Sequence, residues 1–265
     1  MRLHKASLSV TAAVIVSTVG IAAYRHIPEG FPTSASDRGS VIQGTARVAA
    51  GQSVPAPAPP PATVQSRPEF PARLPGLGPR TYAHLPNDSK QVLVVTGAGK
   101  NSASSKAVLW QRVDGRWRPG AVWDAHNGYR GWTDEHYAGD LHSPIGVFGL
   151  TDAGGRLTDP GTKLPYRHSR SFSLSGTGFE GEPLSGAFDY VIAINYNRQP
   201  GTSPMDGTQP MGANRGGGIW IHVDHGGPTH ACVSLSATHM RQLLRTLDPA
   251  ERPVVVMGDA ASLTR

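Results

Sequence analysis

The chain has 265 residues, a formal net charge of +6 and a pI of about 9.7, and 38% of its residues are hydrophobic. This length fits one or two domains. The low apolar content, with 32 glycines and 23 prolines, indicates that part of the chain stays outside a folded core. The basic charge suits an acidic partner, but no block of lysine and arginine typical of nucleic-acid binding is present, so we expect no nucleic-acid partner.

Residues 1–23 have the pattern of an export signal. Met1–Lys5 is short and basic, and Ala6–Ala23 carries no charge and is rich in Val, Ile and Ala. Such a run resembles the core of a signal peptide and also approaches the ~20 apolar residues of a spanning helix. We expect a cleaved signal peptide or a membrane anchor, and either one predicts that the rest of the chain lies outside the cytoplasm.

Residues 24–80 are dominated by Ser, Ala, Gly and Pro. Within them Ser53–Ala62 reads SVPAPAPPPA, which favours an extended polyproline II conformation. Such a segment cannot bury enough apolar surface to offset the entropy of ordering it. The composition therefore predicts a disordered linker over 24–80 and a folded domain over 81–265.

The folded part has the pattern of a mainly β domain. Gln91–Thr96 and Lys106–Val113 are predicted strands, and Asp114-Gly115 predicts a tight hairpin turn after the second. Further short strands are expected around 146–150, 190–196, 218–223 and 254–257. Strands and helices do not alternate, so a dinucleotide-binding fold is not expected.

One helix is predicted late in the chain. Ser236 is a good N-cap, and apolar residues follow it at helical spacing until Asp248-Pro249 ends the pattern. These apolar residues are Met240, Leu243, Leu244 and Leu247.

Candidate catalytic residues gather in Ile219–Leu235. Cys232 is the chain's one cysteine, so it has no partner for an intramolecular disulfide. His222 lies ten positions earlier on a predicted strand, and a turn between them could bring both side chains together. An imidazole that takes the thiol proton and a thiolate that attacks a carbonyl are the minimum for acyl transfer. The backbone N–H groups of Ala231 and Cys232 could form an oxyanion hole.

Two other interpretations remain open at this point. Cys232 could be an inert core residue, or it could join His222, His225 and His230 as zinc ligands, with His126, His136 and His142 nearby in sequence. Residues at i and i+3 on a strand point to opposite faces, which disfavours a shared site for His222 and His225. We therefore expect no metal and no cofactor.

Three segments carry a resemblance to a known family. Thr229–Ser234 (THACVS) resembles the [Ser/Thr]-x-Gly-Cys-hydrophobic-[Arg/Asn/Ser] signature of the YkuD-type L,D-transpeptidases, and the strand ending in His222 resembles its upstream histidine. Gly139–Phe148 resembles the family's Gly-Asp-x-x-[Ser/Thr]-Pro-x-Gly-x-Phe segment, and His126-Asn-Gly128 is similar to its Arg-Asn-Gly. The segments occur in family order, and the resemblance covers about 91–259.

The resemblance implies a fold, a reaction and a partner. The fold is a mainly β sandwich or barrel with a late helix. The reaction forms 3→3 cross-links between peptidoglycan stem peptides through a cysteine thioester, in the cell wall and without a cofactor. We expect a monomer that meets a membrane only through an N-terminal anchor. Alternatives are an L,D-carboxypeptidase, which uses water as acceptor, a non-catalytic wall-binding domain of the same fold, and a zinc-dependent hydrolase.

Two departures from the family pattern concern the nucleophile. Ala231 stands where the family has glycine, and it would be strained by about 1 kcal/mol if its φ were positive. The segment from His222 to Cys232 is also shorter than in many members.

Several neighbours complete the predicted site. We expect His230 and Ser234 at the oxyanion hole or cleft, and Trp220 and Tyr196 as candidate substrate contacts. Ser143-Pro144 is interpreted as a structural turn.

Overall fold

A computed structural model describes residues 69–265. The predicted export signal over 1–23, and the predicted linker up to residue 68, lie outside the described residues. Across the described range, no helix has both the length and the apolar character needed to cross a membrane.

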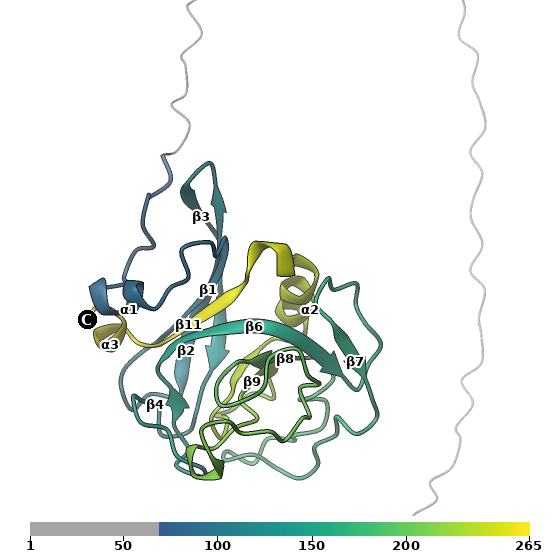
Figure 1. Cartoon of the computed structure of the whole chain (residues 1–265). Helices are drawn as coiled ribbons and strands as arrows, with labels where there is room; N and C mark the ends of the chain where they lie inside the picture. The colour runs from purple at the N-terminus through teal and green to yellow at the C-terminus, as the bar shows by residue number, and fades with distance from the viewer. Residues whose placement is uncertain (1–68) are drawn as a thin grey trace, which may run out of the picture. The chain divides into compact units, whose positions relative to one another are not determined.

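The centre of the fold is a nine-stranded sheet that closes on itself (Figure 1). The strand order is β11-β1-β2-β3-β10-β9-β8-β6-β7, and β11 also pairs with β6, which joins the two sides of the sheet. The nine strands are β1 (Gln91–Gly97), β2 (Ser104–Val113), β3 (Arg116–His126), β6 (Gly146–Gly155), β7 (Tyr166–His168), β8 (Val191–Ile194), β9 (Trp220–Val223), β10 (Val233–Leu235) and β11 (Val254–Asp259). A separate small sheet pairs β4 (Trp132–Thr133) with β5 (Ser143–Pro144). The mainly β barrel or sandwich predicted from the sequence is confirmed.

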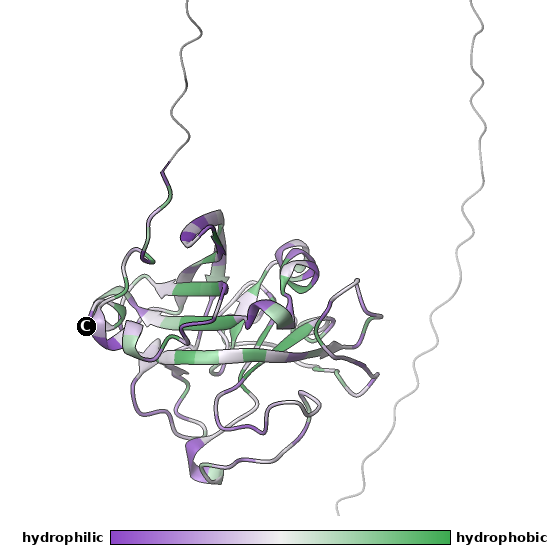
Figure 2. Ribbon diagram, turned by 45° about the horizontal axis from the view of Figure 1, so that its top comes forward, coloured by the Kyte–Doolittle hydropathy of each residue, from purple (hydrophilic) through white to green (hydrophobic). Residues whose placement is uncertain are grey.

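The continuous apolar run of β1 is explained by burial on both faces of the sheet. Leu93 and Val95 point into the main core inside the barrel, and Val92 and Val94 join a second apolar cluster outside it. Figure 2 shows the strands of the barrel as its most hydrophobic part. The second cluster is completed by Leu74, Trp117, Val254, Val256 and Leu263.

The predicted hairpin turn joins β2 to β3. Asp114 and Gly115 have φ values of 51° and 76°, as a two-residue turn of the kind favoured in hairpins requires. The strand after the turn, β3, runs from Arg116 to His126.

Helix α2 (Ala237–Thr246) closes one side of the main core, as the sequence predicted. The Ser236 side chain caps it by accepting from the His239 N–H at 3.2 Å. Its buried residues Met240, Leu243 and Leu244 pack inside the barrel. The remaining helices are short: α1 (Pro79–Ala83), α3 (Ala260–Leu263) and the 3-10 turns η1 (Ala213–Arg215) and η2 (Pro249–Glu251).

Residues 69–80, assigned to the linker by composition, pack against the barrel. The Trp117 N–H donates to the Pro71 carbonyl at 2.9 Å, and the Gly78 N–H donates to the Leu263 carbonyl at 2.8 Å. Leu74 is buried. The few apolar residues among these prolines and glycines supply the contact.

Candidate active site

Two adjacent parallel strands, β9 and β10, bring the cysteine and the histidine to neighbouring positions. In β9 and β10, Ser234 is in register with His222, and the buried Val233 with Ile221. Because side chains alternate along a strand, His222 and Ser234 share the face opposite Ile221 and Val233. Cys232 directly precedes β10, and its Sγ contacts the backbone of Trp220, which lies two positions before His222 on β9.

The Cys232 thiol is half-buried at the end of this strand pair. Its Sγ accepts a hydrogen bond from the Trp220 N–H at 3.4 Å and lies 3.7 Å from the Gly218 carbonyl. Burial raises the pKa of Cys232 to about 11, and the Trp220 N–H opposes this shift only partly. The resting nucleophile is therefore a neutral thiol. It opens into a pocket of about 340 Å³ lined by His136, Ala138, Gly139, Leu141, Gln209, Ala213, Gly216, Gly217, Gly218, Ile219, His230 and Ala231.

His222 is 3% exposed, and its ring is oriented by the backbone. Nδ1 lies 2.9 Å from the Val223 carbonyl, which assigns the ring proton to Nδ1 and leaves Nε2 as a proton acceptor. Burial lowers the pKa of His222 to about 4, although the Val223 carbonyl and the Asp224 carboxylate act in the opposite direction. His222 is therefore a neutral imidazole at neutral pH.

Two side-chain hydroxyl groups fix the backbone around the nucleophile by donating hydrogen bonds to its carbonyl groups. The Ser143 hydroxyl donates to the Ala231 carbonyl at 2.7 Å, and the Thr229 hydroxyl donates to the Cys232 carbonyl at 2.7 Å. Within residues 69–265, the N–H groups of Ala231 and Cys232 donate to no acceptor. Two N–H groups at a fixed turn beside a thiol can hold the oxygen of a tetrahedral intermediate.

Alanine is accommodated at position 231 without backbone strain. The non-glycine residues with positive φ in the described chain are Asp114, Leu141, Asn197 and Arg252. Ala231 is not among them, so the replacement of the family glycine does not strain this turn.

The two upstream motifs form the support of this turn. Asn127 is fully buried, its carbonyl accepts from the Thr229 N–H at 3.0 Å, and the Thr229 carbonyl accepts from the Tyr129 N–H at 2.8 Å. The Gly128 N–H donates to the Ser143 hydroxyl at 2.9 Å. A Cβ at Gly128 would lie 2.6 Å from the Leu141 carbonyl oxygen, which leaves room only for glycine. Ser143 is thus a turn residue, as expected, and also supports the nucleophile.

Ser234 points to a carboxylate and not into the cysteine pocket. Its hydroxyl donates to Asp224 Oδ1 at 2.6 Å, and the same oxygen lies 2.8 Å from His126 Nδ1. The hydrogen bond to Asp224 raises the pKa of His126 despite its partial burial. Burial would raise the pKa of Asp224, but the bonds from His126 and Ser234 outweigh it and hold that pKa below its usual range.

His225 lies beside His222, and the expectation that it points away was wrong. The two rings are stacked with centroids 5.8 Å apart and planes 12° apart. Strand β9 ends at Val223, so the alternation of a strand does not extend to His225. His225 Nδ1 lies 3.1 Å from Glu182 Oε1, and both side chains are largely buried. Glu182 was not found from the sequence, because no motif marks a glutamate 43 positions before His225.

The other predicted site residues lie at different depths. The His230 ring lines the cysteine pocket and lies 4.9 Å from the Phe179 ring. Trp220 packs 4.9 Å from the Phe188 ring and lines a neighbouring pocket of about 320 Å³. Tyr196 is buried behind the cysteine pocket, where its hydroxyl lies 3.3 Å from the His136 carbonyl.

The histidines are distributed among separate carboxylates. His126 contacts Asp224, His225 contacts Glu182, and His136 lies 2.9 Å from Asp140. Over residues 69–265, no three His, Cys, Asp or Glu side chains are arranged to hold a metal ion. Three of the histidines named in the zinc interpretation are thus each paired with a different carboxylate.

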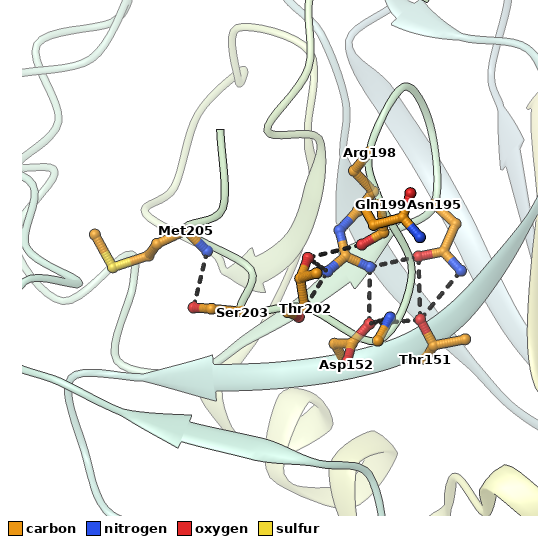
Figure 3. Close-up of polar contacts among 9 residues, drawn as sticks. Thr151, Asp152, Asn195, Arg198, Gln199, Thr202, Ser203 and Met205 are labelled. Carbon is orange, nitrogen blue, oxygen red and sulfur yellow. Dashed lines mark hydrogen bonds and ion pairs between the residues drawn. The ribbon is translucent and has the colours of Figure 1, made fainter. Parts of the chain in front are cut away.

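A buried ion pair anchors the long loop of residues 197–218, which lines both pockets. The Arg198 guanidinium donates to Asp152 at 2.8 Å, to the Asn195 side chain at 2.6 Å and to the Thr202 carbonyl at 2.8 Å. Figure 3 shows these contacts as dashed lines. The Gly201 N–H also donates to Asp152, at 2.9 Å. Asp152 belongs to β6, so the network ties the start of the loop to the barrel.

The chain was compared with known families, curated proteins and solved structures. A sequence model described as the YkuD L,D-transpeptidase catalytic domain matches residues 44–256. No curated protein matches the sequence. Among solved structures, the chain is similar to Bd1075 of Bdellovibrio bacteriovorus, with 17% identity, a TM-score of 0.36, and coverage of 72% of this chain and 53% of that one. The chain thus spans about half the length of that protein.

Proposed function

Since the chain belongs to the YkuD family of L,D-transpeptidase catalytic domains, we propose that it forms 3→3 cross-links between peptidoglycan stem peptides, with Cys232 as nucleophile and His222 as base. The observation that carries this proposal is the pairing of β9 with β10. This pairing supports the proposal, because it brings a neutral imidazole near a thiol and near two N–H groups that have no acceptor within residues 69–265.

In the first half of the proposed reaction, an acyl group moves to the enzyme. The Cys232 proton passes to His222 Nε2, and sulfur attacks the carbonyl carbon of the third residue of a stem tetrapeptide. The Ala231 and Cys232 N–H groups hold the oxyanion. His222 then returns its proton to the departing amine of D-Ala, which leaves a thioester on Cys232.

In the second half, a side-chain amine of a neighbouring stem attacks the thioester. His222 Nε2 takes a proton from this amine, the carbon–sulfur bond breaks, and the thiolate recovers a proton from His222. An amide between two stems is formed, and the enzyme is restored. Water in place of the amine would give carboxypeptidase activity from the same site.

The pKa values of the two groups fit an enzyme with one unprotected cysteine. A raised thiol pKa and a lowered imidazole pKa favour the neutral pair until a substrate carbonyl is in place. Thiols are oxidised chiefly through their thiolate form. A neutral resting pair therefore limits oxidation outside the cytoplasm, where we propose that the protein acts because of its N-terminal segment. A reporter fused after residue 80 and retained in the cytosol would contradict that location.

The test of the proposed function is acylation of Cys232. A carbapenem is a β-lactam that reacts with the cysteine of this family, and incubation should add one adduct to the intact mass of the full chain. The adduct should map to the peptide that contains Cys232, and Cys232→Ala should remove it completely, because the sequence contains no other thiol.

A chain that forms no adduct and leaves a disaccharide-tetrapeptide intact would instead be a wall-binding domain without catalysis. Chelator should leave the reaction unchanged, and loss of activity that zinc restores would contradict a thiol mechanism.

Glu182→Gln should slow acylation roughly tenfold. Glu182 holds the His225 ring that stacks on His222, and its loss lets the base shift from its position. A displacement of about 1 Å at a reacting group can cost up to about 10²-fold in rate. The measurement is the rate constant of adduct formation. Glu180→Gln, in the same hairpin, is the matched control, and equal effects of the two substitutions would exclude a positioning role for Glu182.

A further inference from the structure

Three aromatic rings form a row at the surface beside the cysteine pocket. The Tyr129 and Phe179 rings are stacked, with centroids 4.5 Å apart and planes 16° apart. Phe179 lies in turn 4.9 Å from the His230 ring, at an angle of 45°. Tyr129 is 48% exposed and Phe179 is 38% exposed. An exposed pair of large aromatic side chains is a feature of binding surfaces.

The row is fixed to the backbone that carries the nucleophile. The Tyr129 N–H donates to the Thr229 carbonyl at 2.8 Å, three residues before Cys232. His230 lines the same pocket as Cys232. The row therefore begins in the proposed active site and continues outward across its rim.

The far side of the row is held by a hairpin. The Gly178 N–H donates to the Glu182 carbonyl at 2.8 Å, and Thr177 pairs with Pro183 across the turn. Glu182 contacts the buried His225. Phe179 thus lies on a closed turn, and Glu182 attaches this turn to the loop that follows His222. The row of three rings is therefore formed before a ligand binds.

The charge around the row is balanced. Glu180 follows Phe179, Arg130 follows Tyr129, and both are exposed. Within the described residues neither side chain forms an ion pair. A surface with one charge of each sign does not select an anionic polymer. It suits an uncharged ring whose C–H face packs on an electron-rich aromatic face while its hydroxyl groups stay in water.

We propose that Tyr129 and Phe179 bind an N-acetylated sugar ring of the glycan strand that carries the donor stem. This inference rests on the proposed function, because the stem peptide joins the sugar to the carbonyl that Cys232 attacks. Three extended residues span at most about 10–11 Å. From His230, which lines the pocket, the ring centroids of Phe179 and then Tyr129 follow in steps of 4.9 and 4.5 Å, which is a similar range. The site thereby distinguishes a stem on its glycan from a free peptide.

The test compares two donors with the full chain. The kcat/KM values for release of D-Ala are measured by mass spectrometry for a disaccharide-tetrapeptide and for the free tetrapeptide. We expect the wild type to prefer the disaccharide form. Tyr129→Ala should reduce the ratio of the two values about tenfold, the scale of one lost aromatic contact. Tyr129→Phe, which keeps the ring, should retain the ratio.

Equal losses on both donors would overturn the proposal, because they would show a structural effect on the cleft. If neither donor reacts and no adduct forms on Cys232, the proposed function fails. Sugar binding by the row of aromatic rings is then tested by a binding measurement alone. NMR titration with an N-acetylglucosamine tetramer should then shift the ring signals of Tyr129 and Phe179. Tyr129→Ala should weaken that binding about tenfold, and an unchanged affinity would overturn the proposal.

Discussion

Replacing His222 by alanine should slow acylation of Cys232 by about 10²–10⁴-fold, the usual contribution of a positioned general base. The Val223 carbonyl fixes the proton on Nδ1, and Nε2 is left as the acceptor for the thiol proton. Without the imidazole, acylation depends on the small fraction of Cys232 that ionises against its raised pKa. The rate of carbapenem adduct formation, followed by intact mass, measures the effect.

The pH dependence gives a second measure of the same step. The lowered pKa of His222, about 4, means that the base stays neutral from high pH down to about pH 5 and is lost only below it. The wild-type rate of acylation should therefore change little between about pH 5 and about pH 8, because His222 stays neutral over this whole range. In His222→Ala the rate of acylation should fall about tenfold for each pH unit by which the pH is lowered, because it is proportional to the fraction of Cys232 in the thiolate form.

His168→Ala is the control for replacement of a histidine as such. His168 lies exposed on β7, and its Nε2 contacts the Arg156 carbonyl, outside the residues that line the cysteine pocket. Its substitution should leave both the rate and the pH profile as in the wild type. A His222→Ala variant that matched this control would require another base, and His230 would be the next candidate.

Local chemistry allowed much of the barrel to be predicted. The run of β1 is apolar because both of its faces are buried, and Asp114-Gly115 has the residue types that a two-residue hairpin needs. Ser236 and the apolar spacing after it define α2. In each case, neighbours in sequence determine the outcome.

The closure of the sheet depends on contacts that local patterns do not contain. Val254 pairs with Val92 in a parallel ladder and with Gly149 on its other side, and these partners are far away in the sequence. Strand β10 is only three residues long, which is too short for an alternating pattern. Its place between β3 and β9 nevertheless determines where Cys232 lies.

The candidate site also contains residues that local sequence predicts and residues whose contacts depend on distant parts of the chain. Cys232, His222 and the turn between them could be identified from residue type and spacing. The contacts of His225 could not, because they depend on where β9 ends and on Glu182 from a distant hairpin. Ser234 was expected at the cleft, but its hydroxyl donates to Asp224, which directly follows β9 and bonds through its N–H to the Leu235 carbonyl.

The same dependence on distant partners applies to the loop of residues 197–218. This loop has little regular structure of its own, yet it lines the pockets on both sides of Gly217 and Gly218. Its position is determined at its base, where Arg198 is 8% exposed and Asp152 is 2% exposed. Removing one member of such a pair leaves the other charge buried without a partner.

Asp152→Ala should therefore lower the free energy of unfolding by about 3–5 kcal/mol, the usual cost of breaking a buried ion pair. The substitution leaves the Arg198 guanidinium without its carboxylate and also removes the acceptor of the Gly201 N–H (Figure 3). Denaturant unfolding of the variant and the wild type measures the difference.

Two further variants test whether the stability cost of Asp152→Ala comes from a charge left buried or from the loss of an ion pair as such. Asp88→Ala breaks the 2.6 Å pair between Arg252 and Asp88, both of which are exposed, and should cost no more than about 1 kcal/mol. Asp152→Ala combined with Arg198→Met should recover part of the stability lost in Asp152→Ala, because no unpaired charge remains in the barrel wall. If Asp152→Ala costs no more than Asp88→Ala, the network does not anchor the loop. If instead the double variant recovers stability but acylates slowly, the guanidinium's bonds to Asn195 and Thr202 are what hold the loop beside Cys232.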